Sequence, residues 1–353
     1  MKNIAIFIPS LMPGGAEKQA TLLATMLDKS YNVDIYLLYG DTNIAPQNEE
    51  LLNKSNVKVI RMTGSIISKI FQLKRSLKRR KTDVLLNYLT SCNVIGAIAG
   101  RLAGVQKIYG GIRNARIEWS KMIAEKIIHN HLATGTIFNC YSGAEYFTSK
   151  GFKKNRNIVI PNCFLNIERP IQRNDREIKH IVTAGRFVPQ KDYKTMIASI
   201  AGLKKIRQDF VIDIIGYGAD EDNIRGWIDE YNVNENVNIF IKPNNVQDII
   251  RDADIYISTS LFEGTSNSIM EALNWSLPVV ATNVGDNNRL VINEVNGMLH
   301  DIGDSKGITE SLNMLIDSSE MRNKYGCESN RILKDNYTTT IFEKRYTSLI
   351  ESC

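Results

Sequence analysis

Short apolar runs alternate with amphipathic stretches along almost the whole chain. The apolar runs are rich in isoleucine and valine and mostly lack an apolar–polar alternation, which is typical of parallel strands buried on both faces. Helical patterns lie between them, so the sequence predicts an α/β protein with doubly wound parallel sheets. The expected strands are 4–8, 33–39, 57–61, 84–87, 107–110, 136–139, 158–160, 181–184, 211–215, 237–241, 255–258, 278–281 and 297–299.

The series of strands restarts near residue 178, after a polar stretch that contains Pro170. We therefore expect a first domain over residues 1–167, a linker, and a second domain over residues 178–337. The length of 353 residues agrees with two domains of about 150 residues each. Three helical segments without an intervening strand follow: 305–317, 319–334 and 338–352. The last segment, about 338–353, is a candidate to pack back on the first domain.

The bulk composition describes an ordinary globular protein, with 43% hydrophobic and 23% charged residues. No apolar run approaches the roughly 18–20 residues that span a bilayer, and the first residues lack the pattern of a signal peptide. The five cysteines are scattered and odd in number, which favours free thiols in a reducing compartment. We expect a cytoplasmic protein that is compatible with a peripheral position on the inner face of the plasma membrane.

Charge is distributed unevenly between the two halves of the chain. Residues 1–170 carry 24 lysines and arginines against 11 acidic residues, a balance of +13, and the remaining residues carry 20 against 27, a balance of −7. The first half therefore favours an anionic partner, such as a membrane surface or a lipid-linked phosphate. It lacks basic strands interleaved with aromatic residues, so a nucleic acid is not expected.

The helical stretch 65–81 ends in the basic sequence KRSLKRRK. It is either a membrane-facing amphipathic helix or a solvated helix whose cations suit the carboxyl end of the helix dipole. Because the charges crowd into its last turns, the sequence favours the solvated alternative.

Three segments of the second half follow predicted strands, where open α/β sheets bind their ligands. The sequence GRFVPQK places Arg186 and Lys191 in one loop, and two cations at a strand end suit a diphosphate. The sequence IGYG places Gly216 at a backbone turn open to a ligand. Ordinary surface cations and an ordinary glycine turn are the alternatives at these two places.

The third segment, residues 258–272, has a polar loop with a glycine and then a helix that begins near Asn267. Backbone amides at a helix start bind anions without a charged side chain. Glu263 and Glu271 flank this helix start, and carboxylates accept hydrogen bonds from sugar hydroxyls. Other glutamates share their spacing of eight residues, so the strand-end context singles them out.

These segments belong to a longer set of motifs in a fixed order. They are PGGAE, IPN, GRFVPQKDY, IIGYG, DIYISTSLFEGTSNSIMEALNWSLPVVATNVGDN and NGML. With them the chain resembles the retaining glycosyltransferases of family 4, which have the GT-B fold of two Rossmann-like domains facing a cleft. The resemblance covers essentially the whole chain and is strongest over residues 181–299.

The resemblance implies roles for the charged residues. Arg186 and Lys191 would neutralise the donor diphosphate as the glycosidic bond breaks, which is the reason why the family needs no metal. Glu263 would hold hydroxyls of the transferred sugar, and Glu271 would bind the ribose hydroxyls.

The resemblance also implies close backbone approaches to the donor. Gly14 and Gly15 would let the first domain approach it, and Gly216 would do so from the second. Backbone amides of one loop and helix start would cradle sugar and phosphate; they belong to Gly264, Thr265, Ser266, Asn267, Ser268 and Ile269.

The chain departs from the family pattern at several positions. The family often has a histidine near the reacting carbon, and this chain has Arg113 as the candidate there, with Asn114 next. Lys242 stands where a loop glycine is usual, which leaves the preference for a base open. Asp286 and Arg289 replace a frequent glycine and glutamate, which would reshape sugar selection.

Taken with the resemblance, the residues indicate a retaining glycosyltransferase. The expected donor is a nucleotide sugar, with a UDP-sugar favoured, and the expected acceptor is a saccharide or a polyprenyl-diphosphate-linked saccharide in cell-surface polysaccharide or lipopolysaccharide assembly. No carboxylate nucleophile is apparent, since no acidic residue follows Arg113 until Glu118, and this favours a front-face reaction assisted by the leaving phosphate. A nucleotide-sugar epimerase and a catalytically silent donor-binding scaffold are the alternatives.

One further pattern is misleading. Asp252 and Asp254 form the D-x-D sequence of metal-dependent sugar transferases. Here the pair follows a predicted helix instead of a strand, so capping and solvation are the expected roles, and no metal site is predicted.

Overall fold

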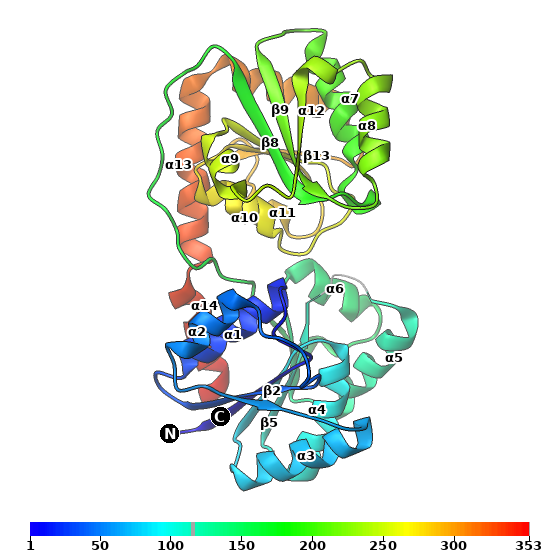
Figure 1. The fold of residues 1–353 in the computed structure, drawn as a ribbon, viewed down its shortest axis with the longest axis vertical. Coiled ribbons are helices and arrows are strands. Elements are labelled where there is room, and N and C mark those ends of the chain that lie inside the picture. The colour runs from blue at the N-terminus through cyan, green and yellow to red at the C-terminus, as the bar shows by residue number, and fades with distance from the viewer. Residues whose placement is uncertain (114–116, 353) are drawn as a thin grey trace. The chain divides into compact units, whose positions relative to one another are not determined.

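The computed structural model describes residues 1–113 and 117–352 (Figure 1). The chain divides into two compact units. The first comprises Met1–Cys163 with Thr339–Cys353, and the second comprises Phe164–Thr338. In the described residues, no helix is both long enough and apolar enough to cross a membrane.

The first unit is built on a parallel sheet that, over the described residues, has seven strands in the order β3-β2-β1-β4-β5-β6-β7. The strands are β1 Asn3–Ile8, β2 Asn32–Leu37, β3 Lys58–Arg61, β4 Val84–Asn87, β5 Lys107–Ile112, β6 Gly135–Phe138 and β7 Asn157–Val159. The helices are α1 Gly15–Leu27, α2 Pro46–Asn53, α3 Ile66–Arg79, α4 Thr90–Ala103, α5 Trp119–Ile127, α6 Tyr141–Ser149 and α14 Thr339–Glu351. Every strand predicted for this half is confirmed, within two residues at each end.

The helices of the first unit cover both faces of its sheet (Figure 1). Helices α1 and α14 contribute to one core together with Ile6 and Ile35. Helices α3 and α4 contribute to the other core together with Phe7 and Leu85. Neighbouring positions of a strand therefore supply opposite cores, which explains why the strands read as continuous apolar runs.

The second unit repeats this architecture with the strand order β10-β9-β8-β11-β12-β13, again all parallel. The strands are β8 Lys179–Arg186, β9 Phe210–Tyr217, β10 Val237–Ile241, β11 Ile255–Ser258, β12 Val279–Thr282 and β13 Gly297–His300. The helices are α7 Tyr193–Lys204, α8 Glu221–Glu230, α9 Val246–Asp252, α10 Asn267–Asn274, α11 Asn287–Leu290, α12 Ser305–Asp317 and α13 Ser319–Asn336. The strands and trailing helices predicted for this half are confirmed.

The stretch expected to be a linker lies against the second unit. The guanidinium of Arg173 donates to four backbone carbonyls, those of Ala253 at 2.7 Å, Ser276 at 2.9 Å, Arg251 at 2.9 Å and Trp275 at 2.6 Å. Burial lowers the pKa of Arg173 to about 10. The residues after Cys163 are thus held by carbonyls far away in the sequence, and this stretch is part of the second unit.

The D-x-D pair has structural partners. Asp254 is buried, its Oδ2 accepts a hydrogen bond from the backbone N–H of His180 at 2.8 Å, and it pairs with Arg176 at 3.2 Å. Asp252 pairs with the neighbouring Arg251 at 3.1 Å. These contacts fix the start of β8 against the start of β11.

Candidate donor site

The segments singled out in the second half meet at the carboxyl edge of its sheet. Gly185 pairs with Gly216 and Arg186 with Tyr217 across strands β8 and β9. Strand β11 lies on the other side of β8 and ends at Ser258. Because all these strands are parallel, the loops that follow them leave the same edge.

An ion pair joins two of these loops. The Lys191 Nζ lies 2.6 Å from Glu263 Oε1, and their side chains are 18% and 11% exposed. The hydroxyl of Ser260 donates to the same carboxylate oxygen at 2.8 Å. The structure therefore brings together two predicted site residues that lie 72 positions apart in the sequence, and it adds Ser260 to them.

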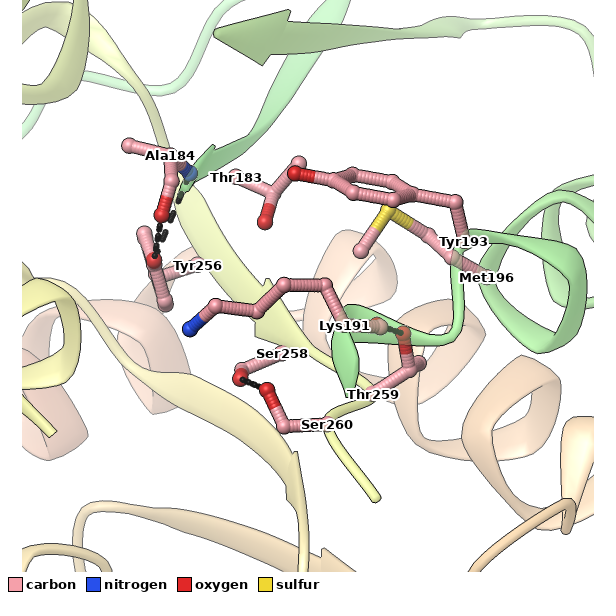
Figure 2. Close-up of a pocket in the computed structure, with 9 residues that line it drawn as sticks. All are labelled: Thr183, Ala184, Lys191, Tyr193, Met196, Tyr256, Ser258, Thr259 and Ser260. Atoms are coloured by element: carbon pink, nitrogen blue, oxygen red, sulfur yellow. Dashed lines mark hydrogen bonds between the residues drawn. The ribbon is translucent and has the colours of Figure 1, made fainter. Parts of the chain in front are cut away.

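A small pocket surrounds this lysine, as Figure 2 shows. Its lining residues are Thr183, Ala184, Lys191, Tyr193, Met196, Tyr256, Ser258, Thr259 and Ser260. The Lys191 side chain extends across the pocket, with its ammonium group toward Tyr256 and Ser258 (Figure 2). Hydroxyl groups and one cation thus dominate the polar lining of this small pocket.

The backbone around Lys191 is held in place by side chains. Asp192 adopts a left-handed conformation with φ of 46°, and its carboxylate accepts from the backbone N–H of Thr195 at 3.3 Å, which caps α7. The hydroxyl of Thr259 donates to the carbonyls of Lys191 at 3.0 Å and Asp192 at 2.9 Å. Aspartate tolerates the left-handed region better than most residues, so it ends the loop and starts the helix at one position.

Two glycines permit close backbone approaches at this edge. A β carbon at Gly216 would lie 2.0 Å from the Gly185 carbonyl oxygen. Gly285 has a φ of 58°, and a β carbon there would lie 2.2 Å from the Glu263 carbonyl oxygen. Any larger residue at these two positions would displace the loops that carry Arg186 and Glu263.

Helix α10 begins at Asn267, as the sequence predicts, and the Ser266 hydroxyl caps it by accepting from the backbone N–H of Ile269 at 3.5 Å. The first amides of a helix have no carbonyl partner within it and lie at the positive end of its dipole. The loop directly after Glu263 therefore leads into the start of α10. The backbone amides of this loop and helix start belong to Gly264, Thr265, Ser266, Asn267, Ser268 and Ile269.

Glu271 lies one turn into α10 and is close enough to Tyr256 for its charge to act on that phenol. Burial is the main cause that raises the pKa of Tyr256 to about 12, and the negative charge of Glu271 adds to it. The Tyr256 hydroxyl in turn donates to the Ala184 carbonyl at 3.2 Å. Glu271 thus lies near Tyr256, which lines the pocket.

Arg186 is exposed at the end of β8. Among the residues that the structure describes, its side chain has no hydrogen-bond or ion-pair partner. The guanidinium is thus available for an anionic ligand, whereas the Lys191 ammonium already donates to Glu263 and has further N–H donors for a ligand. In the described part of the chain, no three His, Cys, Asp or Glu side chains gather where they could share a metal ion.

Sequence reasoning marked Lys242 as a departure but did not foresee its surroundings. Its φ of 45° is left-handed, which explains why a glycine suits this position. The Lys242 ammonium lies 4.5 Å from the centre of the Tyr217 ring. Lys242 therefore has a strained backbone conformation, and its ammonium makes a cation–π contact at the end of β9 that partly offsets the strain.

In the first unit, Gly14 and Gly15 lie at the start of α1. Gly14 is the residue before the helix, and a β carbon there would lie 2.1 Å from a carboxylate oxygen of Glu17. A larger residue at position 14 would therefore push the end of the flexible Glu17 side chain aside, while the extended backbone there, with φ of 178°, admits any residue.

Arg113 follows β5, where its guanidinium lies 4.5 Å from the centre of the Tyr88 ring and donates to the Tyr346 hydroxyl at 3.0 Å. Its Nε and Nη1 are buried and make no hydrogen bond to any described residue. Arg113 thus connects the sheet to α14. The neighbouring candidate Asn114 lies outside the described residues.

The comparisons with known proteins agree with this architecture. Residues 166–331 match the family model of "Glycosyl transferases group 1", and this range contains all the donor-site residues of the second unit. An Escherichia coli UDP-Gal:alpha-D-GlcNAc-diphosphoundecaprenol alpha-1,3-galactosyltransferase is 25% identical over 280 residues, which are 73% of this chain and 71% of that protein. A Campylobacter jejuni N-acetylgalactosaminyltransferase named for a diphospho-undecaprenol acceptor is 26% identical and covers 92% of this chain and 93% of its own.

Solved structures share the fold over the full length. The Anabaena protein HepE in complex with UDP superposes with a TM-score of 0.84, 17% sequence identity and complete coverage of both chains. The lipopolysaccharide outer core galactosyltransferase WaaB superposes with a TM-score of 0.79, 15% identity and 99% coverage of both chains. The second unit is thus similar to the group 1 glycosyltransferases, and the chain as a whole shares the GT-B fold of these structures.

Proposed function

We propose that the protein transfers a sugar from a nucleotide-sugar donor, with retention of configuration, to a saccharide or a polyprenyl-diphosphate-linked saccharide. Cell-surface polysaccharide or lipopolysaccharide assembly at the cytoplasmic face of the plasma membrane is the proposed setting. The observation that carries the donor assignment is the Lys191–Glu263 pair beside the start of α10. Two relatives whose names specify undecaprenyl-diphosphate-linked acceptors support the acceptor class.

The donor diphosphate is the group that the second unit suits best. Arg186 is exposed and unengaged among the described residues, and Lys191 reaches across a pocket of hydroxyl groups. Two cations and a helix start supply fixed positive charge where the leaving group develops its negative charge. This arrangement needs no metal ion, and we propose a metal-independent reaction. The structural neighbour crystallised with UDP supports a UDP-sugar as donor.

The carboxylates suit the neutral parts of the donor. Glu263 accepts from Lys191 and Ser260 through one oxygen, Oε1, so its second oxygen can accept from hydroxyls of the transferred sugar. Glu271, one turn into α10, binds the ribose hydroxyls. Lys191 therefore has two tasks, since it orients Glu263 and faces the phosphates.

We propose retention from the resemblance to the family, and the described residues bear only on the route that it takes. Glu263 is tied to Lys191 and Ser260, which suits hydrogen bonding better than nucleophilic attack. We therefore propose a front-face reaction in which the leaving phosphate takes the proton of the acceptor hydroxyl. Arg113 remains the proposed first-unit residue for the reacting sugar.

The first experiment is a panel of nucleotide sugars, measured for binding and for slow hydrolysis with EDTA present. The wild type is compared with Glu271→Ala and with the control Glu310→Ala, which removes a glutamate from the exposed side of α12. We expect one donor to be used without metal. Its affinity should fall roughly tenfold to a hundredfold in Glu271→Ala, as for a lost charged hydrogen bond, and stay unchanged in the control.

Each other outcome contradicts part of the proposal. No binding to any donor would refute the donor site, and binding without hydrolysis or transfer would favour the silent scaffold. Activity that EDTA abolishes would refute metal independence. Once the donor is known, the anomeric configuration of the product, read by NMR, tests retention.

A further inference from the structure

Helix α3 exposes large apolar side chains that no other described residue of the first unit covers. Its buried side contributes Leu73 and Leu77 to the core. Ile66, Ile67 and Phe71 are 64%, 69% and 60% exposed. Ile67 and Phe71 are four residues apart, so they share one face of the helix. Single exposed apolar residues are common, but a cluster of three at one helix end indicates a contact surface.

The same face continues as a row of cations. Arg75 follows Phe71 by four residues and Lys78 follows it by seven, and both are exposed. We name Ile67, Phe71, Arg75 and Lys78 the α3 stripe. Its first half is apolar and its second half is positively charged.

The segment that carries the stripe has no acidic residue between Met62 and Thr82. It contains seven cations: Lys69, Lys74, Arg75, Lys78, Arg79, Arg80 and Lys81. Arg80 pairs with Asp34 at 2.9 Å, and Lys69 lies over the Tyr39 ring at 5.4 Å. Among the described residues, the other five have no ion-pair partner. Their charge is therefore not neutralised within the unit.

A solvated helix terminus does not explain this pattern. Cations in the last turn suit the helix dipole, and this accounts for Lys78 and Arg79. It does not account for Ile67 and Phe71, which lie in the first turns and lose free energy by facing water. The structure thus adds to the sequence an apolar half of the stripe, and this reverses the preference for the solvated alternative.

The apolar half also decides between anionic partners. A nucleic acid gains from cations and from several stacked aromatic rings, but Phe71 is the one aromatic side chain of the stripe, and the neighbouring Ile66 and Ile67 have no ring face to offer a base. A lipid surface gains from both halves, because the apolar side chains enter the acyl boundary and the cations stay at the head groups.

We propose that the α3 stripe docks the first unit on an anionic lipid bilayer. Ile67 and Phe71 insert at the head-group boundary, while Arg75 and Lys78, with Arg79 beside them, contact the lipid phosphates. The inference goes beyond sugar transfer, since the contact needs neither donor nor acceptor.

The test is co-sedimentation of the full chain with phosphatidylcholine vesicles, with and without phosphatidylglycerol. The charge variant is Arg75→Gln/Lys78→Gln/Arg79→Gln. Its matched control is Lys29→Gln/Lys58→Gln/Lys154→Gln, which removes the same charge from other exposed positions of the first unit. Each cation near such a surface contributes roughly fivefold to partitioning, so we expect about a hundredfold loss in the first triple variant. The control should lose far less.

The apolar half is tested with Ile67→Ser/Phe71→Ser, for which we expect roughly a tenfold loss on vesicles containing phosphatidylglycerol. Circular dichroism checks that the variants fold, and donor hydrolysis in the absence of vesicles should stay at the wild-type level in all of them. Equal loss in the two charge variants would show a diffuse effect of net charge and overturn the stripe. Absence of wild-type binding to the anionic vesicles, or preferential binding to an RNA oligonucleotide, would overturn the lipid surface as partner.

Discussion

Glu125 on α5 is a buried carboxyl whose protonation should control the stability of the first unit. It is 1% exposed, and its Oε1 accepts from the Asn93 side-chain amide at 2.7 Å. Asn93 in turn accepts from the Gly111 N–H at 2.8 Å and donates to the Gly111 carbonyl at 3.1 Å. Glu125 thus supports the end of β5, two residues before Arg113. Burial raises its pKa from 4.5 to about 7, and the hydrogen bond from Asn93 offsets part of that rise.

The sign of the effect follows from linkage. Because the folded state binds the proton more tightly than the unfolded chain, the stabilisation is complete below pH 4.5 and is lost as the pH rises through about 7. The difference of about 2.5 pKa units corresponds to roughly 3 kcal/mol. Glu125→Gln keeps an oxygen acceptor for Asn93 and removes the charge. We expect the variant to match the wild type below about pH 4.5 and to be more stable by up to about 3 kcal/mol at pH 8.

The assay is amide hydrogen exchange by mass spectrometry on peptides from residues 84–112, with exchange rates corrected for the intrinsic effect of pH. These peptides report on the first unit alone, which matters in a chain with two units. Glu145→Gln removes a carboxylate from an exposed position of α6 and should leave the pH dependence unchanged. The same decline in protection from pH 5 to pH 8 in wild type and Glu125→Gln would refute the reasoning.

Three further predictions concern single side chains. Arg173→Ala should destabilise the second unit by roughly 3 kcal/mol or more in urea unfolding, because four carbonyls lose their donor. A loss of stability below about 1 kcal/mol would mean that water replaces the guanidinium as the donor. Gly216→Ala should lower the free energy of unfolding of the second unit by about 1–3 kcal/mol, because its β carbon would lie 2.0 Å from the Gly185 carbonyl oxygen. It should also weaken UDP binding in calorimetry, and unchanged affinity would show that the loops shift without affecting the site. Arg113→Ala should lower transfer about a hundredfold if Arg113 acts on the reacting sugar, and near-full transfer by a folded variant would contradict that assignment.

The fold could be predicted from the sequence because its strands are local signals. An isoleucine- and valine-rich run such as 211–215 reads as a buried parallel strand wherever it is placed. The association of the supposed linker with the second unit could not be predicted in this way. It depends on Arg173 meeting carbonyls between Arg251 and Ser276, and no local pattern in the sequence encodes that meeting.

The residues of the donor site could be predicted from the sequence for a different reason, their resemblance to family motifs. The resemblance points to Lys191 and Glu263 separately, but their distance and the contact of Glu263 with Ser260 are seen only in the structure. A run of three hydroxyl residues at the end of a strand, Ser258 to Ser260, is the signal in the sequence that points to this contact. Lys242 could not be interpreted from the sequence alone, since only the structure shows that this lysine adopts the left-handed backbone conformation.

Helix α14 is synthesised last, although it belongs to the first unit, whose other elements are synthesised first. Its Phe342, Tyr346 and Ile350 belong to the core that also contains residues of β1 and α1, so that core needs segments from both sides of the second unit. The ribosome therefore releases every strand of the first unit long before the helix that covers one face of its sheet. The second unit, which is one continuous stretch, can finish folding while the first still exposes apolar surface to chaperones. Truncation or a frameshift after residue 338 should thus damage the part of the enzyme that was translated first.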